Sequence, residues 1–230
     1  MLNKLYFIFI AIFTLYSSIQ ADILIKQKIQ NNNSGTEISE IWIGKNHYAS
    51  IQKRESIIVD LIKNVLYRIN HSAKTVQELA MPVETLNYFP QPLAGLLGDM
   101  LDSITVQVQS IDQNQTINKW QCNRYEVDIS VQLAGVPVII SMVIWATVDV
   151  PFDWRSVNRR LNFNMRKVLM GLNAGIQKEI QKITGFQIAS DIRIQIADTR
   201  MNFRTEVIEI SQRLPDSKIY SIPNDYRHLQ

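Results

Sequence analysis

The sequence predicts an α+β protein with a curved antiparallel β-sheet, an incomplete barrel, covered by one long and one short helix. Apolar and polar residues alternate with period two through most of residues 22–80 and 103–133, as is typical of strands. Short turns join these stretches, so that neighbouring strands are expected to run antiparallel. Helical spacing of apolar residues appears only at 93–101 and 156–185, which predicts the two helices.

Residues 1–21 are typical of a secretory signal peptide. Lys4 precedes an apolar run from Leu5 to Tyr16, and small and polar residues then lead to Ala21, after which we expect cleavage. A membrane-spanning helix needs about 20 apolar residues. This run is shorter, which disfavours the alternative of an uncleaved anchor. The protein is therefore expected to be periplasmic or secreted.

The mature chain, residues 22–230, is expected to form a single domain. The net charge of the whole chain is +3, and removing a leader with Lys4 and no acidic residue leaves +2 (3 − 1). That balance disfavours nucleic-acid binding. Cys122 is the only cysteine, so an exported domain must be held by its core rather than by an internal disulfide. We expect its thiol to be buried; a reactive nucleophile is the alternative.

Residues 22–80 predict a meander of short strands. "DILIKQKIQ", "EISEIWI" and "HYASIQK" are followed by 56–62 and 65–70, in which apolar residues again alternate. Lys63–Asn64 is a turn candidate because asparagine tolerates positive φ. Parallel neighbours would need a long crossover, for which these turns leave no room.

Residues 81–103 interrupt the sheet. Pro82, Pro90 and Pro92 exclude a central strand. The segment after Pro92 predicts the short helix, which is either a plug at one end of the sheet or a lid. Its apolar stripe consists of Leu93, Leu96, Leu97, Met100 and Leu101.

Strands resume at residue 103. Trp120 and Cys122 share one face, whereas the apolar positions from Tyr125 onward have the opposite parity, so a β-bulge is expected near Asn123–Arg124. Residues 136–150 are apolar on both faces, which predicts a central strand.

Residues 156–185 predict the long helix, with Gly185 as its stop signal. Its expected role is to cover the sheet, and binding to an anionic membrane surface is the alternative. A strand pair at 186–198 and 201–214 follows, and the tail ends in an edge strand, giving about ten antiparallel strands.

Chemistry-bearing motifs are missing from the sequence. His47, His71 and His228 are far apart and show no metal-ligand spacing, and His71 lies in an expected turn where it would be solvated. There is no nucleophile elbow and no glycine-rich phosphate loop. The sequence therefore predicts neither an enzyme nor a cofactor or metal site.

The order of elements resembles the LolA-like periplasmic proteins, which include lipoprotein carriers and related envelope domains. The resemblance is carried by "IWIGKNHYASIQ", "SIIVDLIKNVLYRINHSAKTVQEL", "KWQCNRYEV", "IWATVDV" and "IYSIPNDY". The sequence is also similar in pattern to uncharacterised exported bacterial domains of that architecture. The resemblance implies a half-barrel closed by helices around an apolar cavity.

Two functions follow as expectations. The first is non-catalytic binding of an apolar ligand, a lipid or a lipoprotein acyl chain, in that cavity. The alternative is an envelope interaction or structural domain with a filled core, using Trp42, Trp154 and Tyr226 as surface anchors. The residues expected to line the cavity are Leu93, Leu96, Leu97, Met100, Leu101, Met165, Leu169, Leu172 and Ile176.

Overall fold

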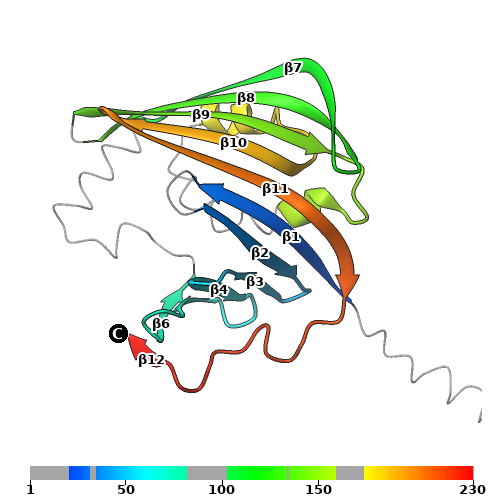
Figure 1. Ribbon diagram of the computed structural model, residues 1–230, viewed down its shortest axis with the longest axis vertical. Coiled ribbons are helices and arrows are strands. Elements are labelled where there is room, and N and C mark those ends of the chain that lie inside the picture. The colour runs from blue at the N-terminus through cyan, green and yellow to red at the C-terminus, as the bar shows by residue number, and fades with distance from the viewer. Residues whose placement is uncertain (1–20, 32–34, 82–102, 134, 159–173, 230) are drawn as a thin grey trace, which may run out of the picture.

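The computed structural model describes residues 21–31, 35–81, 103–133, 135–158 and 174–229. Twelve strands in these ranges form one sheet, ordered β12-β6-β5-β4-β3-β2-β1-β11-β10-β9-β8-β7 (Figure 1). The strands are β1 (Asp22–Asn31), β2 (Gly35–Ile43), β3 (His47–Ile51), β4 (Glu55–Asp60), β5 (Val65–Asn70), β6 (Thr75–Ala80), β7 (Thr105–Ile117), β8 (Trp120–Leu133), β9 (Val136–Thr147), β10 (Phe186–Ile196), β11 (Thr199–Arg213) and β12 (Arg227–Leu229). Helix α4 spans Ala174–Ile180, and residues 154–158 form another short helix.

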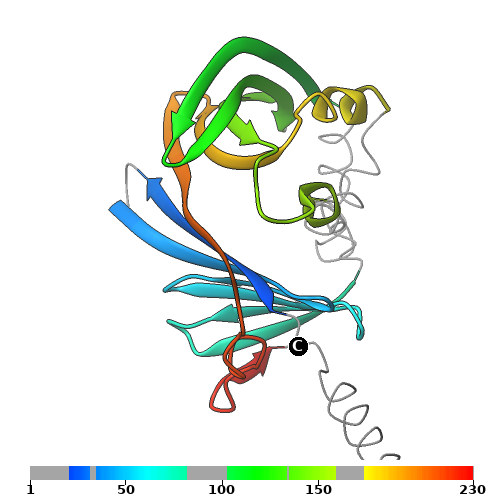
Figure 2. The ribbon, with the colours of Figure 1, turned by 90° about the vertical axis from the view of Figure 1, so that its right-hand side faces the viewer.

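Two antiparallel meanders share the sheet, and the first was expected from the alternating pattern. Strands β1–β6 pair in sequence order, with Asn64 at a φ of 54° in the β4–β5 turn, and β7–β11 do the same. The long strand β11 then pairs with β1, so that the end of the second meander lies beside the start of the first. Figure 2 shows β7–β11 curling into an arc above the flatter layer of β1–β6.

The C-terminal tail crosses the first meander and ends on its outer strand. The predicted edge strand is β12, but it pairs with β6 in parallel, which makes the sheet mixed rather than purely antiparallel. The Arg227 N–H donates to the carbonyl of Lys74 at 2.9 Å, and the Lys74 ammonium pairs with the Asp225 carboxylate at 2.8 Å. These contacts fix the end of the tail at the β6 edge.

The predicted fold class is wrong: the structure is nearly all sheet, not a sheet covered by one long helix. Within the described part of the predicted helix at 156–185, helical backbone is found only up to residue 158 and in α4, and residues 181–185 are turn and coil. Residues 159–173 lie outside the described residues, as do residues 82–102 with the predicted short helix.

A local cause ends α4 five residues before Gly185. The N–H of Lys182 and that of Ile183 bond three residues back, to Glu179 and Ile180, which is the tightening typical of a final helical turn. Gly185 then adopts a φ of 110° with its Cα so close to Thr147 that a Cβ would lie 2.6 Å from the Thr147 carbonyl oxygen. This close approach to β9 leaves no room for a side chain at position 185, directly before β10.

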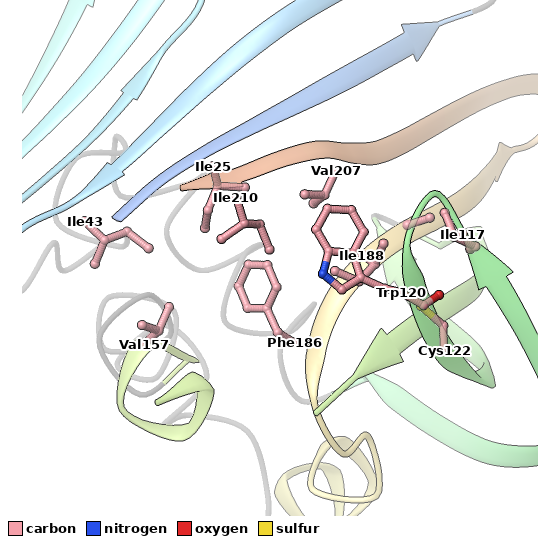
Figure 3. Close-up of a cluster of buried hydrophobic side chains, with 11 residues drawn as sticks. Ile25, Ile43, Ile117, Trp120, Cys122, Val157, Phe186, Ile188, Val207 and Ile210 are labelled. Carbon is pink, nitrogen blue, oxygen red and sulfur yellow. The ribbon is translucent and has the colours of Figure 1, made fainter. Parts of the chain in front are cut away.

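Three buried clusters hold the sheet together. The largest joins the two meanders and is shown in Figure 3, where the side chains of β1, β2 and β11 face Phe186, Ile188 and Trp120. A second fills the space between the first meander and the tail, and is centred on Leu24, Trp42 and Ile69. The third lies on β7–β9 and contains Val108, Tyr125, Val127, Ile144 and Ala146, with Ile183 packed against it.

The parity change that the sequence shows in β8 marks a change of buried face. Trp120 and Cys122 belong to the cluster between the meanders, whereas Tyr125 and Val127 point to the other side, into the third cluster. The β8–β9 register runs without interruption through this point, so β8 carries no bulge there. The irregularity lies opposite, on β7 between Ile111 and Asn114, which face Arg124 and Asn123.

Candidate functional site

One side of β8–β11 is a continuous apolar surface. Directly opposed residues of an antiparallel pair lie on the same face, so the strand registers place three rows of side chains side by side. The row in the middle, for example, runs Ile129, Ile140, Ile194 and Met201. We name the whole set the apolar face: Val127, Ile129, Val131, Val138, Ile140, Met142, Ile192, Ile194, Ile196, Met201 and Phe203.

The opposite side of the same strands carries charge. Arg204 donates to both oxygens of Asp191 at 2.9 Å and contacts Glu206 at 3.4 Å. Arg124 binds Glu126, and its guanidinium also donates to Gln113 at 2.7 Å. A sheet with one ionic and one apolar side has the patterning of a surface that separates water from a nonpolar environment.

Most of the apolar face is only partly covered. Val127, Val131 and Val138 are buried, at 3%, 8% and 7% exposure. The remaining eight side chains are half-buried, including Ile140 and Met142 of β9 and all five from β10 and β11. Soluble proteins rarely leave large contiguous apolar patches in contact with water without a function for them.

A groove adjoins this face at β7 and α4. It is open to solvent and has a volume of about 840 Å³, within the range of small-molecule sites. Its apolar lining is Ile104, Val106, Val108, Ile129, Ile139 and Ile176. Val106 and Val108 pair with Ile129 and Val127, so the groove continues the rows of the apolar face.

Two side chains of α4 and the turn after it fix the helix to the edge of β7. The Glu179 carboxylate accepts the backbone N–H of Val108 at 2.8 Å, and the Lys182 ammonium donates to the Val108 carbonyl at 3.3 Å and to Glu179 at 2.7 Å. The Lys182 ammonium and the Val108 N–H together hold the pKa of Glu179 below its ordinary value. The clamp satisfies backbone groups that an edge strand leaves unpaired and positions one wall of the groove.

Only one residue of the predicted cavity lining lies in the described residues. Ile176, on α4, is 4% exposed and lines the groove. The other eight, Leu93, Leu96, Leu97, Met100, Leu101, Met165, Leu169 and Leu172, lie outside the described residues. Their role stays a prediction.

Sequence reasoning missed the strand residues that form the apolar face. It identified the strands but assigned the ligand contacts to the helices. The signal was present as alternating apolar residues at 127–131, 138–142 and 192–196, yet the sequence does not tell which strands lie side by side. The registers of β9 and β10 make the rows continuous.

Cys122 has the buried structural role that was expected, and Asp60 is a buried acid that binds the backbone of a turn. Burial raises the pKa of the Cys122 thiol to about 11, and the side chain is 1% exposed. The Asp60 carboxylate accepts the N–H groups of Lys63 and Ile62, each at 3.0 Å, in the β4–β5 turn. Chiefly through the Lys63 N–H, this lowers the pKa of Asp60.

His71 is not the solvated turn residue that was expected. Its Nε2 lies 2.7 Å from the Ser56 hydroxyl, and its Nδ1 lies 3.0 Å from the hydroxyl of Tyr226 in the tail. The Ser56 side chain is 2% exposed, so this chain of contacts connects the tail to the sheet without presenting an accessible nucleophile.

The three aromatic residues expected as surface anchors pack inward. Trp42 is 6% exposed in the cluster under the tail, and Tyr226 packs against the same cluster. Trp154 packs against the cluster between the meanders, with the Arg155 guanidinium 4.6 Å from its ring centre. Trp42 is thus buried rather than exposed as an anchor, whereas Trp154 and Tyr226 stay partly exposed, and their role as anchors remains a prediction.

Within the described ranges, no group of three or more histidine, cysteine, aspartate or glutamate side chains is arranged to hold a metal ion. No helix in that part of the chain is long and apolar enough to cross a membrane.

No protein-family model matches the chain, and no curated protein matches it. Among solved structures it is similar to PNGF-II, with a TM-score of 0.38 and 7% identity over 90% of this chain and 30% of that one. It thus spans less than a third of the length of PNGF-II. It is also similar to a LolA superfamily protein from Nitrosomonas europaea, with a TM-score of 0.28 and 8% identity over 89% of this chain and 91% of that one.

A third similar structure is an outer membrane lipoprotein-sorting protein domain from Vibrio parahaemolyticus, with a TM-score of 0.30 and 6% identity over 86% of this chain and 89% of that one. All three TM-scores are below 0.5. LolA-like proteins, which the sequence resembles, are thus found again among the solved structures to which this chain is similar.

Proposed function

We propose that this chain is an exported envelope protein that binds an apolar ligand, a lipid or a lipoprotein acyl chain, without catalysing a reaction. The observation that carries the proposal is the apolar face, which is continuous across four strands, half-exposed, and extended by the groove at β7 and α4. The ligand class is taken from the resemblance of the sequence to the LolA-like proteins. Export is inferred from residues 1–21, which are typical of a signal peptide. The names of two similar structures, a LolA superfamily protein and a lipoprotein-sorting protein domain, agree with this ligand class.

The dimensions of the site support a hydrocarbon chain as the ligand. Neighbouring strands lie about 4.8 Å apart, so the five strands from β7 to β11 span about 19 Å. The three rows of the face extend about 13 Å along the strands, at about 3.3 Å per residue. One acyl chain lying across the strands would cover a large part of this area.

The composition of the face supports binding of varied chain shapes rather than one rigid ligand. Met142 and Met201 lie in adjacent rows, and methionine adapts its three rotatable bonds to its neighbours. The other nine members are a phenylalanine and β-branched residues, which offer no hydrogen bond to a ligand. The absence of catalysis is part of the proposal, because the face has no acid, base or nucleophile to act on a bound chain.

A pair of variants on β10 tests the proposal. Ile194→Glu places a charge in the middle row of the apolar face. Gln195→Glu places the same charge at the next residue of β10, whose side chain lies on the opposite side of the sheet. Both positions are half-buried, so the variants are matched in strand and exposure. The affinity for the fluorescent apolar probe N-phenyl-1-naphthylamine is measured by titration, and folding is checked by circular dichroism.

We expect Ile194→Glu to weaken probe binding by about tenfold or more, because a carboxylate must be desolvated under the ligand. Gln195→Glu should change it by less than about twofold. Equal effects of both variants, or no binding by the wild-type protein, would contradict the proposal.

Native mass spectrometry of protein purified from a bacterial envelope identifies what is bound. A co-purifying lipid supports the carrier function. A stoichiometric protein without lipid would favour the interaction domain instead.

A further inference from the structure

Two hairpin ends lie side by side at one end of the second meander, at the upper left of Figure 1. They are the β8–β9 and β10–β11 connections, and the register pairs Val138 with Ile196 and Ile139 with Gln195. Val136 and Ile139 are 38% and 47% exposed there, on opposite sides of β9. This end of the sheet therefore presents apolar side chains to water from both faces.

Two arginines flank the exposed isoleucine. Gln195 pairs with both Ile139 and Arg200, and Arg193 pairs with Ser141, so Arg193, Arg200 and Ile139 lie on one side of the sheet. Both arginines are exposed, and within the described residues neither takes part in an ion pair. We name Val136, Ile139, Arg193 and Arg200 the hairpin-tip patch.

Asp191 lies two residues before Arg193 on the same side of β10, and both of its carboxylate oxygens accept hydrogen bonds from Arg204 at 2.9 Å. Two further acids lie near the patch. Asp128 is two strands away from Arg193 in the same row, and its carboxylate accepts the Ser141 hydroxyl at 2.8 Å. Asp198 is exposed in the turn between β10 and β11. Neither carboxylate lies within 4.0 Å of a basic group, because neither takes part in an ion pair among the described residues. The two guanidinium groups are thus available to anionic groups from outside the protein.

We propose that the hairpin-tip patch docks the protein onto an anionic lipid bilayer. Val136 and Ile139 enter the boundary between headgroups and acyl chains, and the arginines reach the lipid phosphates from beside them. The proposal rests on the proposed function, because it names the surface from which an apolar ligand reaches the site. Val138 and Ile196, the last row of the apolar face, lie at this same end.

The size of the patch sets the strength of the binding. Two small apolar side chains bury far less area than a single acyl anchor, whose membrane binding is already marginal. Each arginine near an anionic surface contributes about a fivefold increase in affinity. The docking is therefore weak and reversible, as transfer of a ligand requires.

Sedimentation with vesicles tests the inference. The full mature chain is mixed with vesicles of equal parts phosphatidylglycerol and phosphatidylcholine, or of phosphatidylcholine alone, in about 0.1 M salt where charges act over about 10 Å. We expect binding to the anionic vesicles only. The double variant Arg193→Glu/Arg200→Glu should lower that binding by about 20-fold or more. Neither arginine lines the groove, so this variant leaves it unchanged.

Matched controls separate the patch from general surface effects. Val136→Asp, which does not alter the lining of the groove, should lower the binding, whereas Ile38→Asp on β2, at 49% exposure, should not. The double variant Arg54→Glu/Arg227→Glu controls for the change in net charge, which is four units in both double variants. Both side chains are exposed, and the hydrogen bonds of these two residues within the described part of the chain involve their backbone. All variants are compared by thermal unfolding to exclude loss of fold.

Equal loss in the patch and control variants would overturn the inference. Equal binding to both vesicle types would also overturn it, as would self-association through the patch without vesicle binding. Protein that binds the naphthylamine probe but no vesicles refutes this inference alone. Protein that binds vesicles but no probe refutes the proposed function alone.

Discussion

Tyr220→Phe is expected to destabilise the protein by loosening the C-terminal tail. The Tyr220 hydroxyl donates to Oδ2 of Asp22, the first residue of β1, at 2.6 Å. The ring packs on the cluster that contains Leu24 and Trp42, and it lies 5.1 Å from the ring of His47. The substitution removes one oxygen and leaves the ring contacts in place.

The magnitude follows from the type of hydrogen bond. A bond from a neutral donor to a carboxylate contributes about 1.5–3 kcal/mol. The Tyr220 and Asp22 residues are only half-buried, so water replaces part of the lost bond. We therefore expect a loss of about 1–2 kcal/mol in the free energy of unfolding. For a domain of this size that corresponds to a melting temperature lower by about 2–8 °C.

Urea unfolding of a double-mutant cycle measures the bond itself. Tyr220→Phe, Asp22→Asn and the double variant give the coupling energy between the two side chains. Tyr67→Phe is the matched control, because Tyr67 packs on the same cluster and its hydroxyl has no partner among the described residues. A coupling energy near zero, or an equal loss in Tyr67→Phe, would refute the role given to this contact.

Two further predictions concern titratable groups. With its pKa near 11, the Cys122 thiol should have about one thiolate in a thousand molecules at pH 8, so Ellman's reagent should react only after unfolding in urea; rapid labelling of the native protein would contradict its burial. For Asp60, the folded pKa is below the unfolded value, so its contribution to stability is complete above about pH 4 and is lost as the pH falls through the folded pKa. The difference in unfolding free energy between wild type and Asp60→Asn should therefore shrink as the pH falls below about 4, and a difference that stays constant would contradict this role.

The sheet was largely predictable from the sequence, since strand formation leaves a local trace. The alternation in residues 56–70 and the short turn at Asn64 were sufficient to predict antiparallel neighbours, and β4 and β5 pair in that way. The burial of Cys122 was also predictable, because it shares the apolar face of its strand with Trp120 and a free cysteine is usually buried as a small apolar side chain.

The fold class and the candidate site depended on contacts between distant parts of the chain. Helical spacing continued up to Gly185, but α4 ends at Ile180, and no pattern within the segment indicates that Gly185 lies against Thr147 of β9. The parallel pairing of β12 with β6 joins residues about 150 positions apart. The same return of the tail to the first meander places the Tyr226 hydroxyl beside His71.

The amino-acid sequence alone determined which segments become strands and which side of each strand is apolar, because both follow from the period of the residues. Only the tertiary structure decided that the apolar sides of β8 to β11 form one surface, with the paired charges of Arg204 and Asp191 behind it. The physical reason is that strand order and register are set by packing over the whole sheet. A shift of one residue in any strand would have reversed its faces and broken the surface.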